Sequence, residues 1–280
     1  MTEMATTLIG GKTIRERRPF GLKRDLLAIA HDITPWLLPI LLLAVWQAAC
    51  TFGMLSAAVL PSPLAVADAA WRLTLSGELP RNMEISFLRA IAGLVVGGGI
   101  GFVLGLANGL SDLSERLTDS TVQMIRNVPH LAMIPLVILW FGIDEGAKLF
   151  LVALGVFFPI YINTLHGVRT VDPQLIEMAE SYGMGPAALF WRVILPGALP
   201  SIFVGLRFAL GIMWLTLIVA ETIAAQSGIG YMAMQAREFM QVDVVVLSIL
   251  IYAFLGKLAD LIARALERAS LSWHPAFQKA

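Results

Sequence analysis

The residue types that most often perform covalent or metal chemistry are few in this sequence and lie far apart. The chain contains one cysteine, Cys50, and four histidines, which are His31, His130, His166 and His274. A catalytic nucleophile needs a base close by, and a metal site needs several ligands at short spacings, so the pattern fits neither. We therefore expect no catalytic residue, no metal site and no cofactor on this chain.

Four polar side chains inside apolar stretches are candidates for another task, the passage of a small anion. Arg126, Asn127 and His130 lie in a segment interrupted by Pro129, and Arg207 lies in a later apolar stretch. An anion crossing a medium of low dielectric constant favours arginine side chains and the amino ends of helices. Both arginines could instead extend to lipid headgroups or pair with an acid, because they lie near the expected inner ends of their spans.

The composition indicates a membrane protein. Hydrophobic residues make up 58% of the chain, charged residues make up 14%, and the mean hydropathy is +0.77, which lies outside the range of soluble globular proteins. We expect an all-α polytopic membrane protein with about six transmembrane helices, each of roughly 20 residues. The expected spans cover residues 33–53, 84–110, 120–143, 149–167, 201–220 and 244–263. The formal net charge of +0 gives no indication of nucleic-acid binding.

The basic residues predict the orientation of these spans. A basic N-terminal segment (1–30) precedes the transmembrane domain (31–268), and a polar tail (269–280) follows it. Twelve lysines and arginines belong to segments expected inside the cell, and four belong to segments expected outside. Because basic residues are retained on the cytoplasmic side, both termini are expected in the cytoplasm.

The expected second span carries glycine at every fourth position: Gly93, Gly97, Gly101, Gly105 and Gly109. Small residues at this spacing form one face of a helix and allow a neighbouring backbone to approach closely, which favours association of helices within a membrane. We interpret the stripe as a packing face, either within one subunit or across a dimer.

Residues 172–200 form the longest feature outside the expected spans. Asp172 and Pro173 are typical of a helix start, whereas Gly183, Gly185 and Pro186 end that helix and allow a second to begin. The segment is rich in apolar residues for a short loop, and an exposed apolar patch of this kind usually marks a contact with another protein. The pattern predicts a helical hairpin on which a partner docks.

This hairpin resembles the EAA loop of bacterial ABC-importer permeases in its spacing of Glu177, Ala179, Gly183, Leu195 and Pro196. Met178 and Val193 depart mildly from the family's pattern. Further stretches are similar to the sulfonate, taurine and nitrate branch of this family, and most similar to its aliphatic sulfonate members. They are residues 60–63, 86–89, 194–201, 205–211, 213–222, 236–239 and 273–275.

The resemblance implies a type I ABC importer transmembrane-domain fold in the bacterial inner membrane. It implies a complex of two copies of this permease, two cytoplasmic ATPase subunits that hold ATP and Mg, and a periplasmic substrate-binding protein. The hairpin, as the EAA coupling loop (172–200), would be the segment that the ATPase subunit binds. The transported molecule would be a small organic anion, with aliphatic sulfonates expected first and taurine, nitrate or bicarbonate as alternatives.

Two other classes of protein, an intramembrane enzyme and an ion-coupled secondary transporter, fit less well; the scattered histidines and single cysteine argue against the enzyme. An ion-coupled secondary transporter would use acids within its spans, whereas the candidate acids here lie at the edges: Glu84, Glu221, Asp243 and Asp260. Glu221 is expected to help close an outer gate or hold the following loop, not to bind an anion. The hairpin could also be an ordinary amphipathic connection between two spans.

Overall fold

The computed structural model describes residues 22–273, with side chains from residue 37 onward, and this part of the chain is helical with no strand. Residues 1–21 of the expected N-terminal segment and 274–280 of the tail lie outside it. The elements are α1 (Leu22–Thr51), α2 (Pro63–Leu75), α3 (Glu78–Leu110), α4 (Asp112–Arg126), η1 (His130–Met133), α5 (Ile134–Phe141), α6 (Glu145–Arg169), α7 (Pro173–Ser181), α8 (Pro186–Leu189), η2 (Phe190–Ile194), α9 (Leu195–Ala224), α10 (Ile229–Glu238) and α11 (Val242–Ser270).

Four stretches of helix are long and apolar enough to cross a membrane: α3, α6, the run from α8 to α9, and α11. A fifth is possible if α4 and the η1–α5 pair count as one broken span. The apolar residues 37–51 of α1 are the described part of the expected first span. The all-α, multi-pass membrane architecture is therefore confirmed. The total of six spans stays a prediction.

The expected third span (120–143) is wrong as a single kinked helix. The chain instead forms α4 from Asp112, ends it at Arg126, and resumes at His130 with a bend of 78°. Pro129 has no amide hydrogen, and it disfavours the helical conformation in the residue before it, so the break is larger than a kink. Ser111 begins α4 by accepting a hydrogen bond from the amide of Ser114 at 3.4 Å. The connection between the expected second and third spans is therefore helical from Asp112 onward.

The core is a layer in which α6 lies between α3 and α9. The glycine stripe of α3 faces α6 within the same subunit. A Cβ at Gly101 would lie 2.6 Å from the carbonyl oxygen of Phe157, and one at Gly109 would lie 2.7 Å from the Cβ of Val168. The lack of side chains on this face of α3 therefore allows the two backbones to approach closely.

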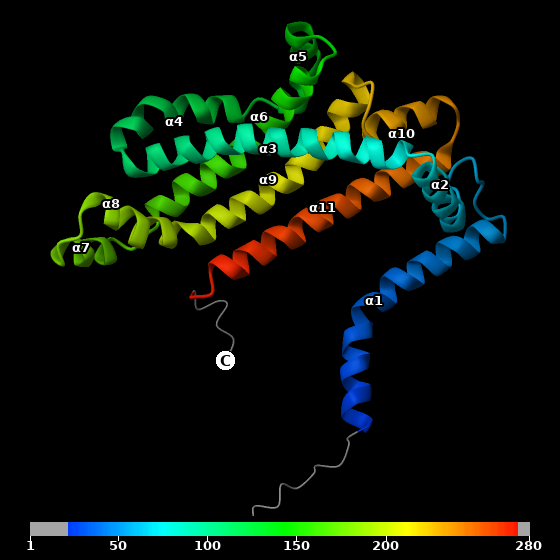
Figure 1. The fold of residues 1–280 in the computed structure, drawn as a ribbon, viewed down its shortest axis with the longest axis horizontal. Helices are drawn as coiled ribbons and strands as arrows, with labels where there is room; N and C mark the ends of the chain where they lie inside the picture. The colour runs from blue at the N-terminus through cyan, green and yellow to red at the C-terminus, as the bar shows by residue number, and fades with distance from the viewer. Residues whose placement is uncertain (1–21, 274–280) are drawn as a thin grey trace, which may run out of the picture.

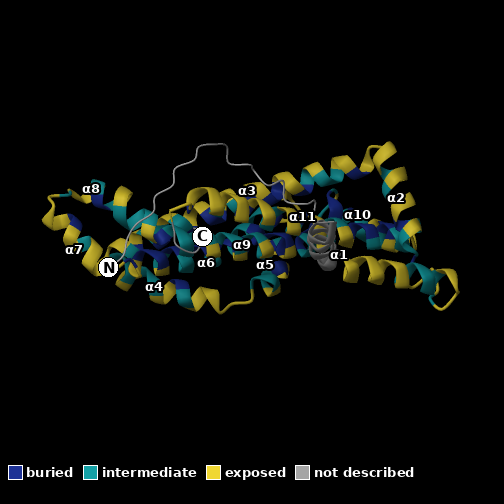
Figure 2. Ribbon diagram, turned by 90° about the horizontal axis from the view of Figure 1, so that it is seen from below, coloured by how far each residue is buried: buried dark blue, intermediate teal, exposed yellow. Residues whose placement is uncertain are grey.

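The hairpin and α10 lie at opposite ends of the bundle (Figure 1). The α7 and α8 helices form one end, whereas α2 and α10 form the other, and α9 runs between them. The α1 helix extends away from the bundle. Exposed residues follow the outward faces of the long helices (Figure 2), as expected for surfaces that contact lipid.

Replacing Gly97 with valine should weaken the α3–α6 contact, whereas the same change at Gly99 should not. A Cβ at Gly97 would overlap the backbone of Ala153, while one at Gly99 meets nothing within 4 Å. Overpacking costs roughly 1–3 kcal/mol, so detergent-solubilised Gly97→Val should unfold at a lower temperature than Gly99→Val. Equal unfolding temperatures for the two variants would contradict this packing.

Candidate functional site

The first arm of the hairpin (residues 172–200) is α7, and local interactions fix both of its ends. Asp172 caps the start, where its carboxylate accepts a hydrogen bond from the amide of Gln174 at 2.9 Å, and Pro173 occupies the first turn. At the other end the amide of Gly183 donates to the carbonyl of Glu180 at 2.8 Å. The amide of Met184 donates to the carbonyl of Ala179 at 3.1 Å.

This pair of bonds is a Schellman motif, and it requires a left-handed residue after the helix. Gly183 occupies that position with φ +80°, and a Cβ there would meet nothing within 4 Å. The need for glycine is therefore conformational and not a matter of space. The turn sets the direction in which the second arm leaves.

The second arm differs from expectation. Residues 186–224 form one continuous helical run, so the expected span at 201–220 begins too late. A π-helical turn, η2, joins α8 to α9, with the amide of Leu195 bonded to the carbonyl of Phe190. Leu195 and Pro196 are the first residues of α9 and lie directly after this turn. Pro196 has no amide hydrogen, so it donates no hydrogen bond to the preceding turn of this run.

The two arms enclose an open, largely apolar groove of about 640 Å³. Ala179 of α7 is buried and lines it, and Pro196 of α9 lines it from the other arm. Glu177 is exposed on α7 and is not among the residues that line the groove. Tyr182 lines the groove and is 82% exposed, and Trp191 of η2 in the second arm is 66% exposed. An open apolar groove of this kind is suited to receive a helix or side chain of another protein.

The four candidate pathway residues do not form one cluster. Arg126 and Asn127 are exposed at the end of α4, where the Asn127 amide donates to the carbonyl of Gln123 at 3.0 Å. His130 is half-buried, and its Nε2 lies 3.0 Å from the Oγ1 of Thr216 on α9. The helix break at Pro129 therefore directs one polar side chain, His130, into the bundle.

Arg207 lies elsewhere on α9, about 14 Å from Thr216 by the rise of the helix. Its Nε lies 3.2 Å from Asp260 and its NH1 lies 3.8 Å from Glu267, both on α11. Arg207 therefore pairs with acidic side chains, which was one of the alternatives to a role in the anion pathway. A role in the anion pathway stays a prediction for all four residues.

The sequence singled out Glu221, as a residue that could hold the following loop, but not the polar cluster around it, which lies where α9 leads into α10. We call it the Glu221 network; its members are Ser86, Arg89, Glu145, Glu221, Ser227 and Tyr252. The Glu221 side chain is 0% exposed and lies 2.8 Å from the NH1 of Arg89, whose side chain is 7% exposed. Arg89 also binds Glu145 through Nε and NH2 at 2.6 Å each. Arg89 could have indicated this cluster from the sequence, because an arginine within an apolar span is rare and usually paired.

Metal ligands do not gather in the described part of the chain. Among residues 22–273, no group of three or more histidine, cysteine, aspartate or glutamate side chains could hold a metal ion. The polar interactions found there are hydrogen bonds and ion pairs within and between helices.

Replacing Gly183 with alanine should loosen the hairpin, and Gly185→Ala is the matched control. A non-glycine residue in the left-handed region costs roughly 1–2 kcal/mol, whereas Gly185 has φ −72° and free space around it. Amide hydrogen exchange in α7 should therefore accelerate in Gly183→Ala and stay unchanged in Gly185→Ala. The same exchange rates in both variants would contradict the proposed turn.

The comparisons with known proteins agree with this geometry. Residues 86–271 match the family described as binding-protein-dependent transport system inner membrane component. The chain is 61% identical over 245 residues to the putative aliphatic sulfonates transport permease protein SsuC of Escherichia coli (strain K12), covering 88% of this chain and 93% of that protein. It is 46% identical to the Bacillus subtilis (strain 168) protein of the same name, over 86% and 88% of the two chains. It is 38% identical to the E. coli taurine transport system permease protein TauC, over 83% and 86%.

Solved structures show the same fold at low sequence identity. The amino acid ABC transporter crystallised with histidines aligns with a TM-score of 0.54 at 18% identity, over 70% of this chain and 97% of that one. The inward-facing MetNI methionine ABC transporter aligns with a TM-score of 0.51 at 18% identity, over 71% and 97%. These likenesses confirm the expected type I importer transmembrane-domain fold. Together with the family match, they mean that this chain belongs to the binding-protein-dependent transport system inner membrane components.

Proposed function

We propose that this chain is the membrane permease subunit of an ATP-driven importer for aliphatic sulfonates. The observation that carries the proposal is the 61% identity to the E. coli SsuC permease over most of both chains. The exposed apolar groove of the hairpin supplies the structural element that such a subunit needs. The chain itself performs no covalent chemistry, and the energy comes from hydrolysis of ATP, which a partner subunit binds together with Mg.

Two cytoplasmic ATPase subunits are the proposed partners of the hairpin. The groove opens between α7 and the start of α9, so an inserted side chain would contact Ala179 and Pro196 together. Glu177, exposed on α7, would orient the ATPase through a polar contact. Leu195 begins the long helix α9, so displacement of the hairpin is passed directly to a membrane span.

A second copy of the permease is proposed to complete the membrane complex. The apolar side chains of α1 are largely exposed, including Leu38, Leu42 and Val45. The helix leaves the bundle and contacts α2 near its end (Figure 1). Such a helix can be covered by lipid or by another copy, and a dimer would place a pathway between two bundles.

The remaining partners follow from the same proposal. A periplasmic substrate-binding protein would deliver the anion to the α2–α10 end, and both termini would lie on the cytoplasmic side of the inner membrane. Alternating access then requires ATP and the loaded binding protein each to favour one conformation over another. Taurine is the second candidate substrate, because a taurine permease is 38% identical. Nitrate and bicarbonate remain further alternatives.

Uptake into proteoliposomes should test this function. Ethanesulfonate should accumulate only when the ATPase, ATP and the binding protein are present, and dissipating an ion gradient should have no effect. Uptake that follows the ion gradient without ATP would instead indicate a secondary transporter. Competition by taurine and nitrate for the binding protein would rank the substrates.

Glu177→Ala should lower this uptake, with Glu180→Ala as the matched control on the same helix. Loss of a hydrogen bond to a charged group costs roughly 1.5–3 kcal/mol, so binding of the ATPase should weaken roughly tenfold or more. Membrane insertion should be unchanged. Equal uptake and equal ATPase binding in the two variants would refute the role given to Glu177.

The pathway arginines call for a separate test. At limiting substrate, Arg126→Gln and Arg207→Gln should each reduce uptake by roughly tenfold, the cost of one lost bond to an anion. Arg116→Gln on α4 and Arg264→Gln, which removes another partner of Asp260 at 2.9 Å, are matched controls. Full uptake in the Arg126 and Arg207 variants would assign both side chains to structural roles.

A further inference from the structure

The α10 helix cannot cap its own amino end. Its N-cap residue is Gly228, which has no side chain and adopts φ +106°, a conformation that residues with a Cβ rarely adopt. The first amides of a helix have no partner within the helix and need acceptors from elsewhere. For α10, these acceptors come from two other helices.

Ser86 of α3 accepts a hydrogen bond from the amide of Ile229 at 2.9 Å. Glu221 of α9 accepts one from the amide of Gly230 at 2.9 Å. A carboxylate at the amino end of a helix is also favoured by the helix dipole. The start of α10 is thus attached by hydrogen bonds to α3 and α9.

Glu221 is itself held from several sides. Its carboxylate accepts hydrogen bonds from the hydroxyls of Ser86 and Tyr252, each at 2.8 Å, and from Arg89 at 2.8 Å. A buried carboxylate is tolerated when charge and hydrogen bonds compensate its lost hydration. The start of α10 lies directly against Glu221, because a Cβ at Gly230 would fall 2.6 Å from the Cβ of Glu221. The fit leaves little room for α9 and α10 to move separately.

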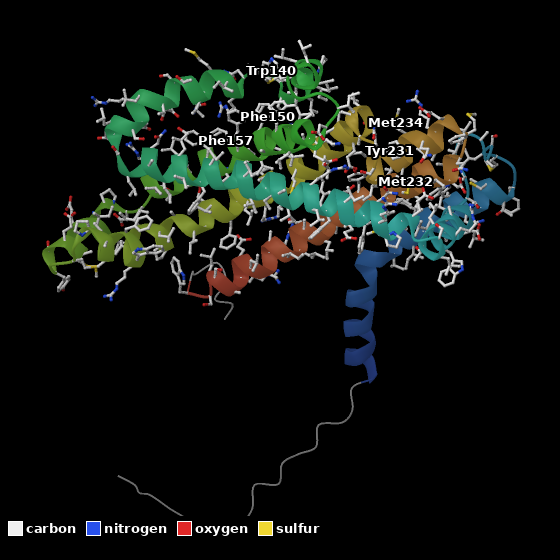
Figure 3. The ribbon with its side chains drawn as sticks, turned by 45° about the horizontal axis from the view of Figure 1, so that its top comes forward. Trp140, Phe150, Phe157, Tyr231, Met232 and Met234 are labelled. Atoms are coloured by element: carbon white, nitrogen blue, oxygen red, sulfur yellow. The ribbon has the colours of Figure 1, made fainter. Side chains whose placement is uncertain are left out.

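The same helix that bears Glu221 begins at the hairpin. Glu221 lies about 39 Å from Leu195 along α9, by the rise of the helix, and the helix between them is continuous. Figure 3 places Tyr231, Met232 and Met234 on α10, at the end of the molecule away from the hairpin. One rigid element therefore connects the groove to the cap of α10.

We propose that Glu221 is a positioning residue that makes α10 follow the movement of α9. The proposal rests on the proposed function, in which the ATPase displaces the hairpin. Displacement of the hairpin shifts α9, and the Glu221 carboxylate carries the start of α10 with it. The loop at 225–228 then changes its exposure in step with the nucleotide state, although no nucleotide binds near it.

A thiol-labelling experiment on the whole complex tests this link. Replacing Cys50, the single cysteine, with serine allows one reporter, Gln226→Cys, at an exposed position of the loop. The reaction rate with a membrane-impermeant maleimide is measured without nucleotide and after trapping with ATP and vanadate. Coupling between distant sites typically changes an equilibrium about fivefold or more, so the two rates should differ by that order.

Glu221→Gln should abolish the difference between the two rates while ATP hydrolysis continues. Ser86→Ala is a milder second variant, because it removes one hydroxyl from the cap. Ser248→Ala is its matched control: this buried hydroxyl donates at 2.8 Å to the carbonyl of Val244 within its own helix. The ratio of the two labelling rates, without nucleotide and after trapping, should fall to one in Glu221→Gln. It should be reduced in Ser86→Ala and retained in Ser248→Ala.

The opposite results would overturn the proposal. A ratio retained in both Glu221→Gln and Ser86→Ala would mean that α10 follows α9 by other contacts, or moves independently. Loss of the ratio in Ser248→Ala as well would mean that any buried hydroxyl has the same effect. A purified complex without an ATPase would overturn the proposed function and the transmission step together, whereas a retained ratio would overturn only the role of Glu221.

Discussion

The close approach of α6 to the helices on both sides of it is the contact on which the rest of the structure depends. Glycines of α3 face α6 on one side, and on the other a Cβ at Gly205 of α9 would lie 2.9 Å from the carbonyl oxygen of Pro159. Gly167 of α6 is equally close to α9, since a Cβ there would lie 2.8 Å from the carbonyl oxygen of Ala198. Helices in a membrane gain little from the hydrophobic effect and associate by such packing. The three-helix layer therefore holds α9 as a rigid element.

The two ends of α9 differ in whether their side chains find partners within the chain. At the α10 end, the two buried charges of the Glu221 network, Glu221 and Arg89, find partners within the chain. At the hairpin end, an apolar groove remains open, and side chains such as Trp191 remain exposed. A polar network completed internally favours a fixed arrangement, while an unfilled apolar groove favours a partner. This asymmetry agrees with an element that receives force at one end and positions a helix at the other.

The expected helix boundaries were wrong near two prolines, because a proline can either end a helix or lie inside one. Pro129 divides the expected third span into helices that meet at 78°, while Pro200 lies inside α9 without ending it. The residue type is the same in both places, so proline by itself could not separate the two cases. The outcome depends on whether packing holds the helix together around the missing hydrogen bond, as it does where α9 lies against α6.

The sequence alone determined the features that depend on neighbouring residues or on composition. These were the helical membrane class, the hairpin with its Asp172 cap and Gly183 turn, and the small-residue face of α3, because capping, backbone conformation and hydropathy are local properties. Tertiary structure decided which helix covers the glycine face. It also paired Arg207 with Asp260, 53 residues away, and Arg89 with Glu221, 132 residues away. Neither pairing has a local signature, since each depends on where whole helices come to lie.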